Sequence, residues 1–443
     1  MKDIVIPDKV RKIMDTLFEN GAEIYVVGGA VRDLLLGREV KDWDFTTNLT
    51  PEEMKKLFPK NSFCNNEFGT FSIVGKNGEI FEVTTFRTEK GYSDNRHPDE
   101  VKWGKTLEED LSRRDFTINA LALSDGEKII DLFDGQKDLE NKIVRTVGNP
   151  DERFKEDALR MMRAVRIAGQ IGFSIEEETL KSIQKNAKLI NNVAGERIRD
   201  ELFKILLSSP PSLGIEILRE SGLLAEIMPE LMEGLGMAQK GHHIDDVWTH
   251  NLKTLDNCQT QNPITKLAAL LHDVGKPKSM YGEGEKRTFH NHEVYGSRIA
   301  VQIGKRLRLS NKELDQLFRL VRWHMFTVQE TQTDKAIRRF IRNVTVDYID
   351  EMIALRRADR LGSGAKETSW RWELFKKRIV EVQKQPFAVK DLKVNGEDVM
   401  KILNIKPGRK VGEVLNAIFK EVEEKPELND REVLIEKIGK FKK

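Results

Sequence analysis

An apolar run that ends in two glycines, followed by two closely spaced aspartates, limits how the first part of this chain can fold. Residues 24–27 are apolar enough for a buried strand, and Gly28 and Gly29 follow directly. Asp42 and Asp44 come shortly afterwards, in the sequence KDWDF. A second short strand there would carry both carboxylates on one face, because side chains along a strand alternate with a period of two. The order predicts a strand that ends in a glycine turn and a strand that presents two carboxylates.

These residue types together suit the transfer of phosphate groups. Glycine lets the backbone approach a phosphate closely, and Arg32 follows one helical turn later. Two adjacent carboxylates repel each other unless a cation lies between them. Magnesium prefers carboxylate oxygens together with substrate phosphates. We therefore expect Gly28, Gly29 and Arg32 to bind nucleotide, and Asp42 and Asp44 to be catalytic magnesium ligands. If it stood alone, the glycine pair could be a simple turn, and the two aspartates could simply be solvated.

Composition and charge restrict the function classes. The chain has 443 residues, enough for several domains, and a net charge of +2. Any surface for nucleic acid must therefore be local, because the chain as a whole is not a polycation. Two distant cysteines, Cys64 and Cys258, indicate no disulfide framework. There is no apolar run long enough to cross a membrane and no signal-peptide core, so we expect a cytoplasmic protein with no membrane partner.

Strand-like segments are concentrated in the first third of the chain. They are residues 24–27, 43–46, 71–74, 80–86 and 128–131, separated by turn signals. From about residue 150 onward the apolar positions repeat at helical spacing. The fold class is therefore predicted as α+β, with a small mixed β-sheet and helices in the head, followed by an elongated all-α remainder.

Two further segments of the head carry candidate active-site residues. Glu82, in IFEVTTFR, lies on a later predicted strand and is the candidate third catalytic carboxylate, although a strand glutamate is often simply solvated. In RRDFTINALAL, Arg114 is the better candidate for a triphosphate contact, because the guanidinium fork matches phosphate. The apolar residues after Asp115 and Thr117 predict a helix, with Asp115 as its cap or as an orienting partner.

The ordered series of motifs resembles a known enzyme family. The segments are GGAVRDLLLG, KDWDF, RRDFTINALA, DLFDGQKDL, FKEDALRMMRAVRIAGQIGF and GERIRDEL. Together they resemble the class II tRNA nucleotidyltransferases, or CCA-adding enzymes, and the related bacterial poly(A) polymerases of the DNA polymerase β superfamily. The resemblance covers residues 20–210 most clearly. It implies a nucleotidyltransferase head (1–147), a helical neck for nucleobase recognition (148–220), a helical body (221–360) and a helical tail for tRNA (361–443).

Asp157 and Arg160 are the candidate readers of the nucleobase. On one continuous helix their spacing of three would make them neighbours on one face. Aspartate only accepts hydrogen bonds and arginine only donates them, which matches the edges of cytosine and adenine. Guanine and uracil would leave polar groups unpaired, at about 1–3 kcal/mol each. The resemblance implies the same, since the family's EDxxR motif selects CTP and ATP. An ordinary ion pair within one helix is the alternative.

Further arginines follow in the same region. Arg163 is expected to flank the site, whereas Arg166, another 60° back around the helix, is expected to point away. Both match nucleotide-contacting positions of the family. Arg197 and Arg199 either contact the RNA end or pair with neighbouring carboxylates.

The polar segment 88–110 predicts a long exposed loop. In the family a flexible loop here takes part in the switch from C to A addition, and its presence favours complete CCA addition. A plain connector is the alternative.

The middle of the chain contains a second set of candidate ligands. LLHDVGKP resembles the signature of HD-superfamily metal phosphohydrolases, and the series H…HD…H…H…D predicts an HD-type body. The candidate metal ligands are His250, His272, Asp273, His292, His324 and Asp359. Histidine nitrogen beside a carboxylate suits manganese, nickel, iron or zinc. The resemblance implies a phosphatase or phosphodiesterase that could trim damaged tRNA 3′ ends. A polar helix surface is the alternative.

The tail completes the prediction. Two helical patterns flank Lys406–Lys410, and the cations of this segment suit a phosphate backbone. The region resembles the tail that holds the tRNA elbow in the family. A plain helical hairpin is the alternative. We expect template-independent CCA addition to the tRNA 3′ end from CTP and ATP, with magnesium and release of pyrophosphate. A poly(A) polymerase, or an HD phosphohydrolase with an RNA-binding head, is the competing interpretation. The sequence leaves monomer and dimer open.

Overall fold

The chain divides into two compact units in the computed structural model. Unit 1 contains Met1–Leu235 and Gln302–Ser310, and unit 2 contains Gly236–Val301 and Asn311–Lys443. The structure describes residues 6–60, 62–64, 70–75, 78–90, 100–103, 106–124, 128–239, 245–326, 333–366, 369–383 and 389–442. Within these ranges no helix is long and apolar enough to cross a membrane. The four domains expected from the sequence, and the limits given for them, stay a prediction.

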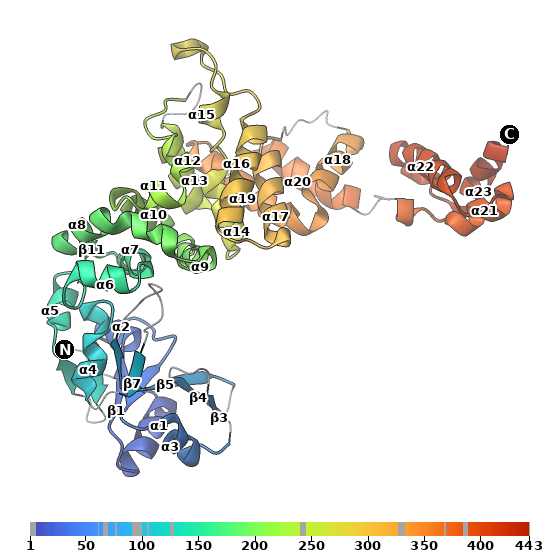
Figure 1. Cartoon of the computed structure of the whole chain (residues 1–443). Helices are drawn as coiled ribbons and strands as arrows, with labels where there is room; N and C mark the ends of the chain where they lie inside the picture. The colour runs from blue at the N-terminus through green and yellow to red at the C-terminus, as the bar shows by residue number, and fades with distance from the viewer. Residues whose placement is uncertain are drawn as a thin grey trace. The chain divides into compact units, whose positions relative to one another are not determined.

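The N-terminal part of unit 1, blue in Figure 1, contains a seven-stranded mixed sheet. Its strand order is β3-β4-β5-β2-β1-β8-β9. The strands are β1 (Ile24–Val27), β2 (Asp44–Thr47), β3 (Ser62–Cys64), β4 (Thr70–Val74), β5 (Ile80–Thr85), β8 (Leu121–Ser124) and β9 (Ile129–Asp131). Five of them confirm the predicted strands to within one or two residues. The predicted helix after Asp115 and Thr117 was wrong, because this apolar segment forms a 3-10 turn, Thr117–Asn119, and then β8.

The strand register brings the turn and the carboxylates to one place. β1 pairs antiparallel with β2, so that Val27 lies opposite Asp44. β2 pairs parallel with β5, so that Asp44 lies beside Glu82. Phe45 and Val83, the next residues on the two strands, are buried on the opposite face of the sheet. This alternation leaves Asp44 and Glu82 together on the face that the core does not use.

The segment predicted as a long exposed loop is partly a hairpin. β6 (Arg87–Lys90) pairs antiparallel with β7 (Glu100–Trp103), with Arg87 opposite Trp103. Residues 91–99, 104 and 105 lie outside the described residues, so the loop's role in switching from C to A addition stays a prediction. The hairpin places regular backbone pairing where the sequence predicted an exposed loop.

Helices surround the sheet and continue through the rest of unit 1. They are α1 (Asp8–Glu19), α2 (Gly29–Leu35), α3 (Pro51–Leu57), α4 (Leu107–Ser112), α5 (Gly135–Glu140), α6 (Pro150–Glu156), α7 (Leu159–Ile171), α8 (Glu177–Asn186), α9 (Gly195–Leu206), α10 (Pro211–Glu220), α11 (Leu223–Ile227) and α12 (Pro229–Met232). Short strands β10 (Ile143–Val144) and β11 (Ser174–Ile175) pair beside α7. The apolar positions of α7, including Met161, Met162 and Val165, are buried as their spacing predicts.

Helices form the regular elements of unit 2. They are α13 (Val247–Asn257), α14 (Pro263–Leu271), α15 (Lys276–Ser279), α16 (His292–Arg306, whose last residues belong to unit 1), α17 (Asn311–Trp323), α18 (Asp334–Val344), α19 (Ile349–Gly362), α20 (Trp370–Gln383), α21 (Gly396–Leu403), α22 (Arg409–Glu424) and α23 (Arg431–Gly439). α13 packs along α19, and α14 contacts α13, α17 and α19. The last three helices bury an apolar cluster of their own that includes Val399, Ile418 and Leu434. The predicted all-α character of this region is confirmed.

Candidate functional sites

Gly28 has a backbone conformation that residues with a side chain rarely adopt. It lies between β1 and α2 with a φ of 74°, in the left-handed region that favours glycine. A Cβ atom there would lie 3.1 Å from Nη1 of Arg114 and 3.9 Å from Oδ2 of Asp44. The glycine turn therefore lets an arginine and a carboxylate approach the backbone at the end of β1.

A cavity of about 980 Å³ in unit 1 brings together most of the predicted head residues. Those that line it are Gly29, Arg32, Asp42, Asp44, Glu82, Arg163 and Arg166. Asp42 precedes β2 and does not belong to it, so the predicted single strand for both aspartates was too long at its start. Cavity walls that partly exclude water raise the pKa of Asp44; Arg114 lowers that pKa, and the charges of Glu82 and Asp42 raise it again.

This arrangement of carboxylates fits a hard cation. Asp44 keeps solvent-exposed surface, and the neighbouring charges of Glu82 and Asp42 add to the desolvation that raises its pKa. Carboxylate oxygens from Asp42, Asp44 and Glu82 are the donor type that magnesium prefers. The residues present therefore match the expected ion in chemistry, in charge and in access to the cavity.

Asp110 holds the arginine pair in place and was not predicted from the sequence. Its side chain on α4 is fully buried. It accepts hydrogen bonds from Nε and Nη2 of Arg113, at 3.1 and 2.6 Å, and from Nη2 of Arg114 at 3.0 Å. Burial raises the pKa of Asp110, but the two guanidinium groups outweigh it and leave the pKa below its ordinary value. An acidic residue three or four positions before two arginines was the available signal.

A chain of hydrogen bonds, which we call the Arg32–Arg163 relay, connects two walls of the cavity. Nη1 of Arg32 donates to Oδ1 of Asn119 at 2.9 Å, and Nδ2 of Asn119 donates to Oδ1 of Asp115 at 3.1 Å. Arg163 closes the chain with Nε and Nη2 at 2.8 and 2.5 Å from Oδ2 of Asp115. Burial alone would raise the pKa of Asp115, but Arg163 and Asn119 hold it far below its ordinary range. Asp115 is thus the orienting partner that the sequence suggested.

Arg166 does not point away, as the helical rotation suggested, but lines the same cavity. Its Nε lies 2.5 Å from Oε2 of the buried Glu201, and its Nη1 donates to Oε1 of Gln170 at 2.9 Å. These contacts hold the side chain between α7 and α9, at the lining of the cavity. Arg199 is held by Asp200 at 2.8 Å, one of the two outcomes left open for it.

The predicted pairing of Asp157 with Arg160 on one helix is not observed. α6 ends at Glu156, Asp157 has an extended backbone, and α7 begins at Leu159. Asp157 accepts from Nη2 of Arg197 at 2.8 Å, while Nη1 of Arg160 lies 2.5 Å from Oε2 of Glu156. The carboxylate also accepts from the backbone N–H of Leu159, the first residue of α7, at 3.1 Å, while Ala158 is the N-cap of that helix. Their nucleobase-reading role stays a prediction.

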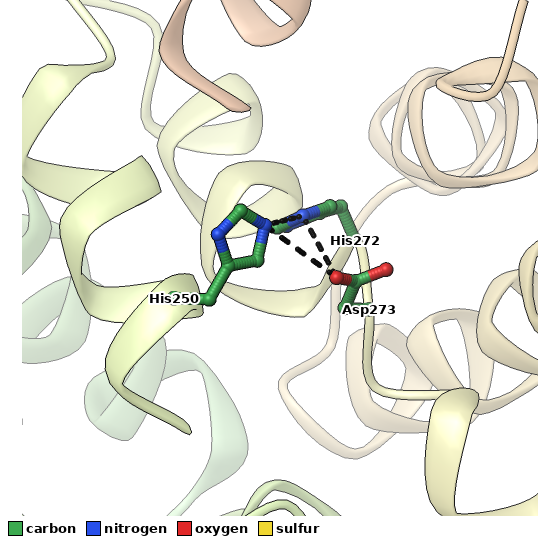
Figure 2. A group of neighbouring side chains, drawn as sticks. All are labelled: His250, His272 and Asp273. Atoms are coloured by element: carbon green, nitrogen blue, oxygen red, sulfur yellow. Dashed lines mark hydrogen bonds and ion pairs between the residues drawn. The ribbon is translucent and has the colours of Figure 1, made fainter. Parts of the chain in front are cut away.

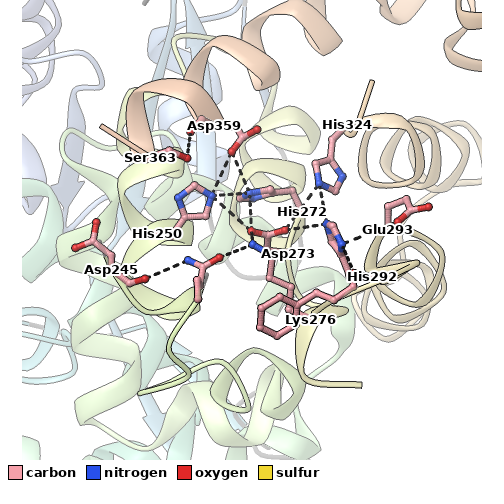
Figure 3. Close-up of polar contacts among 12 residues, drawn as sticks. Asp245, His250, His272, Asp273, Lys276, His292, Glu293, His324, Asp359 and Ser363 are labelled. Carbon is pink, nitrogen blue, oxygen red and sulfur yellow. Dashed lines mark hydrogen bonds and ion pairs between the residues drawn. The ribbon is translucent and has the colours of Figure 1, made fainter. Parts of the chain in front are cut away.

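All six predicted ligands of unit 2 meet in one buried centre (Figure 3). Nε2 of His250 lies 3.1 Å from Nε2 of His272 and 3.2 Å from Oδ1 of Asp359. Figure 2 shows His250 and His272 turned toward the same oxygen of Asp273, at 3.5 and 3.3 Å. The other oxygen of Asp273 lies 3.2 Å from His292 and 3.8 Å from His324. His290, the remaining histidine nearby, is exposed.

Backbone carbonyls fix the orientation of three of these histidines. Nδ1 of His272, His292 and His324 lies 2.8, 2.9 and 2.8 Å from the carbonyl oxygens of Ala269, Phe289 and Val321, respectively. Nδ1–H donates to each carbonyl, so Nε2 carries the lone pair and faces the centre. Such hydrogen bonds behind a ligand are typical of histidines that bind metal.

The donor set of this centre fits a transition metal. Two overlapping groups, His250–His272–Asp273 and Asp273–His292–His324, each bring three ligand atoms within 4.8 Å of one another. Burial and the neighbouring His272 lower the pKa of His324 to about 3, so its imidazole is neutral and able to bind metal. Lys276, which the sequence analysis missed, places Nζ 2.5 Å from Oδ2 of Asp273.

Comparison with known proteins identifies the family. A CCA-adding enzyme of Ligilactobacillus salivarius (strain UCC118) is 36% identical over 447 residues, which cover 98% of this chain and 98% of that protein. This chain belongs to the CCA-adding enzyme family. A CCA-adding enzyme of Geobacillus sp. (strain WCH70) is 48% identical over 215 residues, 48% of this chain and 53% of the relative. The protein is accordingly a nucleotidyltransferase, as its motifs predicted.

Solved structures of CCA-adding enzymes share the fold. The Bacillus stearothermophilus enzyme in complex with CTP has 29% identity and a TM-score of 0.73, covering 99% of this chain and 98% of that chain. The Thermotoga maritima enzyme complexed with tRNA_CCA has a TM-score of 0.58 at 22% identity, covering 99% and 97%, and shows the fold alone.

Family models match several regions of the chain, and two of these regions overlap. The Poly A polymerase head domain matches residues 24–145, and the HD domain matches residues 235–363. A second domain of tRNA nucleotidyltransferases matches residues 300–438. The HD match contains the whole six-residue centre of unit 2.

Proposed function

We propose that this protein adds C, C and A to the 3′ end of tRNA without a template, using CTP and ATP and releasing pyrophosphate. The observation that carries the proposal is the unit 1 cavity, where Asp42, Asp44 and Glu82 face Arg163 and Arg166 in a member of the CCA-adding family. Carboxylates and guanidinium groups in one cavity suit a triphosphate that arrives with its cation. We place the reaction in the cytoplasm.

Asp42 and Asp44 would hold magnesium, with Glu82 completing the carboxylate set. When bound, magnesium would activate the attacking 3′ hydroxyl and stabilise the charge of the leaving pyrophosphate. Gly28 leaves the backbone accessible, and Arg114 directs its guanidinium to the same point. Arg32 and Arg163, locked by the relay, supply positive charge at fixed positions, so little reorganisation is needed when the triphosphate binds.

Selection of C and A is proposed to depend on Asp157 and Arg160, each held by its own charged neighbour. Arg197 orients the Asp157 carboxylate as an acceptor, and Glu156 orients Arg160 as a donor. Guanine and uracil would meet these groups with like partners, at about 1–3 kcal/mol for each unpaired polar group. We propose that the exposed turn Lys406–Lys410, between α21 and α22, contacts the phosphate backbone at the tRNA elbow.

A primer-extension experiment tests this proposal. The protein is incubated with magnesium, tRNA lacking CCA, and each nucleoside triphosphate singly and in combination, and the new 3′ ends are sequenced. We expect ends that stop after CCA with the wild type, no extension with Asp44→Asn, and normal extension with Glu19→Gln, an exposed carboxylate on α1. Long A tracts would replace the proposal by poly(A) synthesis, and ends that stop at CC would refute complete CCA addition.

The six-residue centre supports a second activity, a metal-dependent phosphohydrolase. Asp273 belongs to both groups of three candidate ligands and directs one carboxylate oxygen toward each pair of histidines. This set of donors suits manganese, nickel, iron or zinc. A bound metal would generate a hydroxide nucleophile near neutral pH. Metal per chain, measured by inductively coupled plasma mass spectrometry, should be high in the wild type and lost in Asp273→Asn. Absence of metal after reconstitution, or hydrolysis of a simple phosphodiester that persists in Asp273→Asn, would refute this second role.

A further inference from the structure

A second cavity, of about 540 Å³, lies in unit 2 and has a distinct chemical character. It is lined by Met325, Phe326, Arg356, Arg360, Ser369, Trp370, Arg371 and Trp372. The lining combines three arginines with three aromatic side chains, and among these described residues there is no carboxylate. Its volume lies within the range of pockets that bind small molecules.

Two segments of the lining adjoin, in the sequence, candidate ligands of the six-residue centre. Met325 and Phe326 directly follow His324 in sequence. Arg356 and Arg360 flank Asp359 on α19, and Nη1 of Arg356 lies 2.5 Å from Oδ2 of Asp359. The other oxygen of Asp359 is the one that faces His250 and His272. A phosphate held by Arg356 would therefore be one side chain away from the candidate metal ligands.

The aromatic side chains offer flat surfaces in fixed positions. Phe326 and Trp372 pack against each other, with ring centroids 6.0 Å apart, and both contact Phe375. Trp370, by contrast, is 59% exposed, and the guanidinium of Arg371 lies 5.4 Å from its ring centroid. An exposed indole beside a cation is the kind of surface on which nucleobases stack.

The arginines select the charge of the ligand. Arg356 uses Nη1 for Asp359 and has further donors in its fork, and Arg360 donates from Nη2 to the carbonyl of Lys366 at 3.0 Å. Guanidinium groups match phosphate oxygens in geometry and charge. One lining that offers both an aromatic surface for a base and cations for a phosphate fits a nucleotide better than a protein segment.

We propose that this cavity is the substrate pocket of the six-residue centre and binds a nucleoside monophosphate unit, with the base on Trp370 and the phosphate at Arg356 and Arg360. The proposal rests on the phosphohydrolase role proposed above and names its substrate class. The unit is either a free nucleotide or the terminal nucleotide of a single-stranded RNA. Any base is accepted, because stacking is largely independent of base identity.

Calorimetric titration of the full chain with UMP tests the proposal. UMP is chosen because the unit 1 site is proposed to reject uracil, and EDTA is present so that no metal-dependent turnover occurs. We expect UMP to bind more tightly than uridine or inorganic phosphate, because each lacks one half of the contacts. Trp370→Ala should weaken binding by about 5- to 100-fold, Trp370→Phe should largely preserve it, and Arg360→Gln should weaken it about tenfold.

Matched variants and a second readout keep the test decisive. Tyr281→Ala removes an aromatic side chain that is 81% exposed outside the cavity, and Arg339→Gln removes an exposed arginine on α18; neither should change UMP binding. Equal binding by Trp370→Ala and the wild type, or no UMP binding at all, would overturn the proposal. An RNA trinucleotide with a 3′ phosphate, compared with one with a 5′ phosphate, distinguishes an RNA end from a free nucleotide.

Failure of the hydrolase role gives a different pattern. If UMP binds through Trp370 but no phosphoester is hydrolysed with any of the four metals, the pocket is correct and the second activity is wrong. If a substrate without a base, bis-p-nitrophenyl phosphate, is hydrolysed by the wild type while UMP binding does not depend on Trp370, the activity is correct and the pocket is wrong.

Discussion

Replacing Asp110 by asparagine should loosen one end of the unit 1 site without touching the carboxylates that would hold magnesium. Asp110 is fully buried and accepts three hydrogen bonds from Arg113 and Arg114. Removing one partner of a buried ion pair costs about 3–5 kcal/mol. Each arginine side chain keeps 18% of its surface exposed and recovers some hydration. We therefore expect a local destabilisation of about 2–4 kcal/mol.

Hydrogen exchange measured by mass spectrometry is the appropriate assay, because unfolding of a chain with two compact units is not expected to be two-state. Peptides that cover α4 should exchange roughly 30- to 1,000-fold faster in Asp110→Asn than in the wild type. Glu108→Gln, an exposed carboxylate on the same helix, is the control. Since Arg114 contacts the glycine turn, the KM for CTP should rise about tenfold.

The pH dependence of this effect follows from the lowered pKa of Asp110. A carboxyl whose folded pKa is depressed stabilises the protein above its unfolded pKa, and this stabilisation is lost as the pH falls through the folded value. The difference between wild type and variant should be complete at pH 6 and shrink only below about pH 4. Unchanged exchange of α4, or the same acceleration in Glu108→Gln, would show that Asp110 does not hold the arginine pair.

Three further predictions concern other groups. Glu82→Gln should slow nucleotide incorporation in single-turnover experiments by at least about 100-fold while CTP affinity changes little; a normal rate would remove Glu82 from the catalytic set. Arg197→Gln should leave Asp157 less constrained and raise UTP misincorporation about tenfold in competition with CTP; unchanged selectivity would separate Arg197 from base reading. His292→Ala should lower bound transition metal per chain without affecting CCA addition, and full metal retention would exclude His292 as a ligand.

The sequence predicted those parts of the sites that depend on local pattern. The order of motifs was sufficient to group Asp42, Asp44 and Glu82 as one candidate carboxylate set, and the H…HD…H…H…D series named the six candidate ligands that meet in unit 2. The segment 121–124 was misjudged because a short apolar run is compatible with both a buried strand and a helix. The break at Asp157 has no glycine or proline that would signal it. Asp110 was missed because the sequence analysis placed it at the end of an exposed loop, although Arg113 and Arg114 follow three and four positions later. Lys276 was missed although its partner Asp273 lies only three positions earlier.

The Arg32–Arg163 relay has a consequence for how such enzymes exchange parts. Its two ends, Arg32 and Arg163, are more than a hundred positions apart in the sequence, yet each of its four residues hydrogen-bonds to the next. A chimera that joins the first 120 residues of one relative to the helices of another would keep its cavity only if Asn119, Asp115 and Arg163 remain mutually compatible. The residues that must be exchanged together are therefore a hydrogen-bonded set that includes residues of both the sheet-containing head and the following helices. A chimera whose junction lies between the sheet and these helices would separate them.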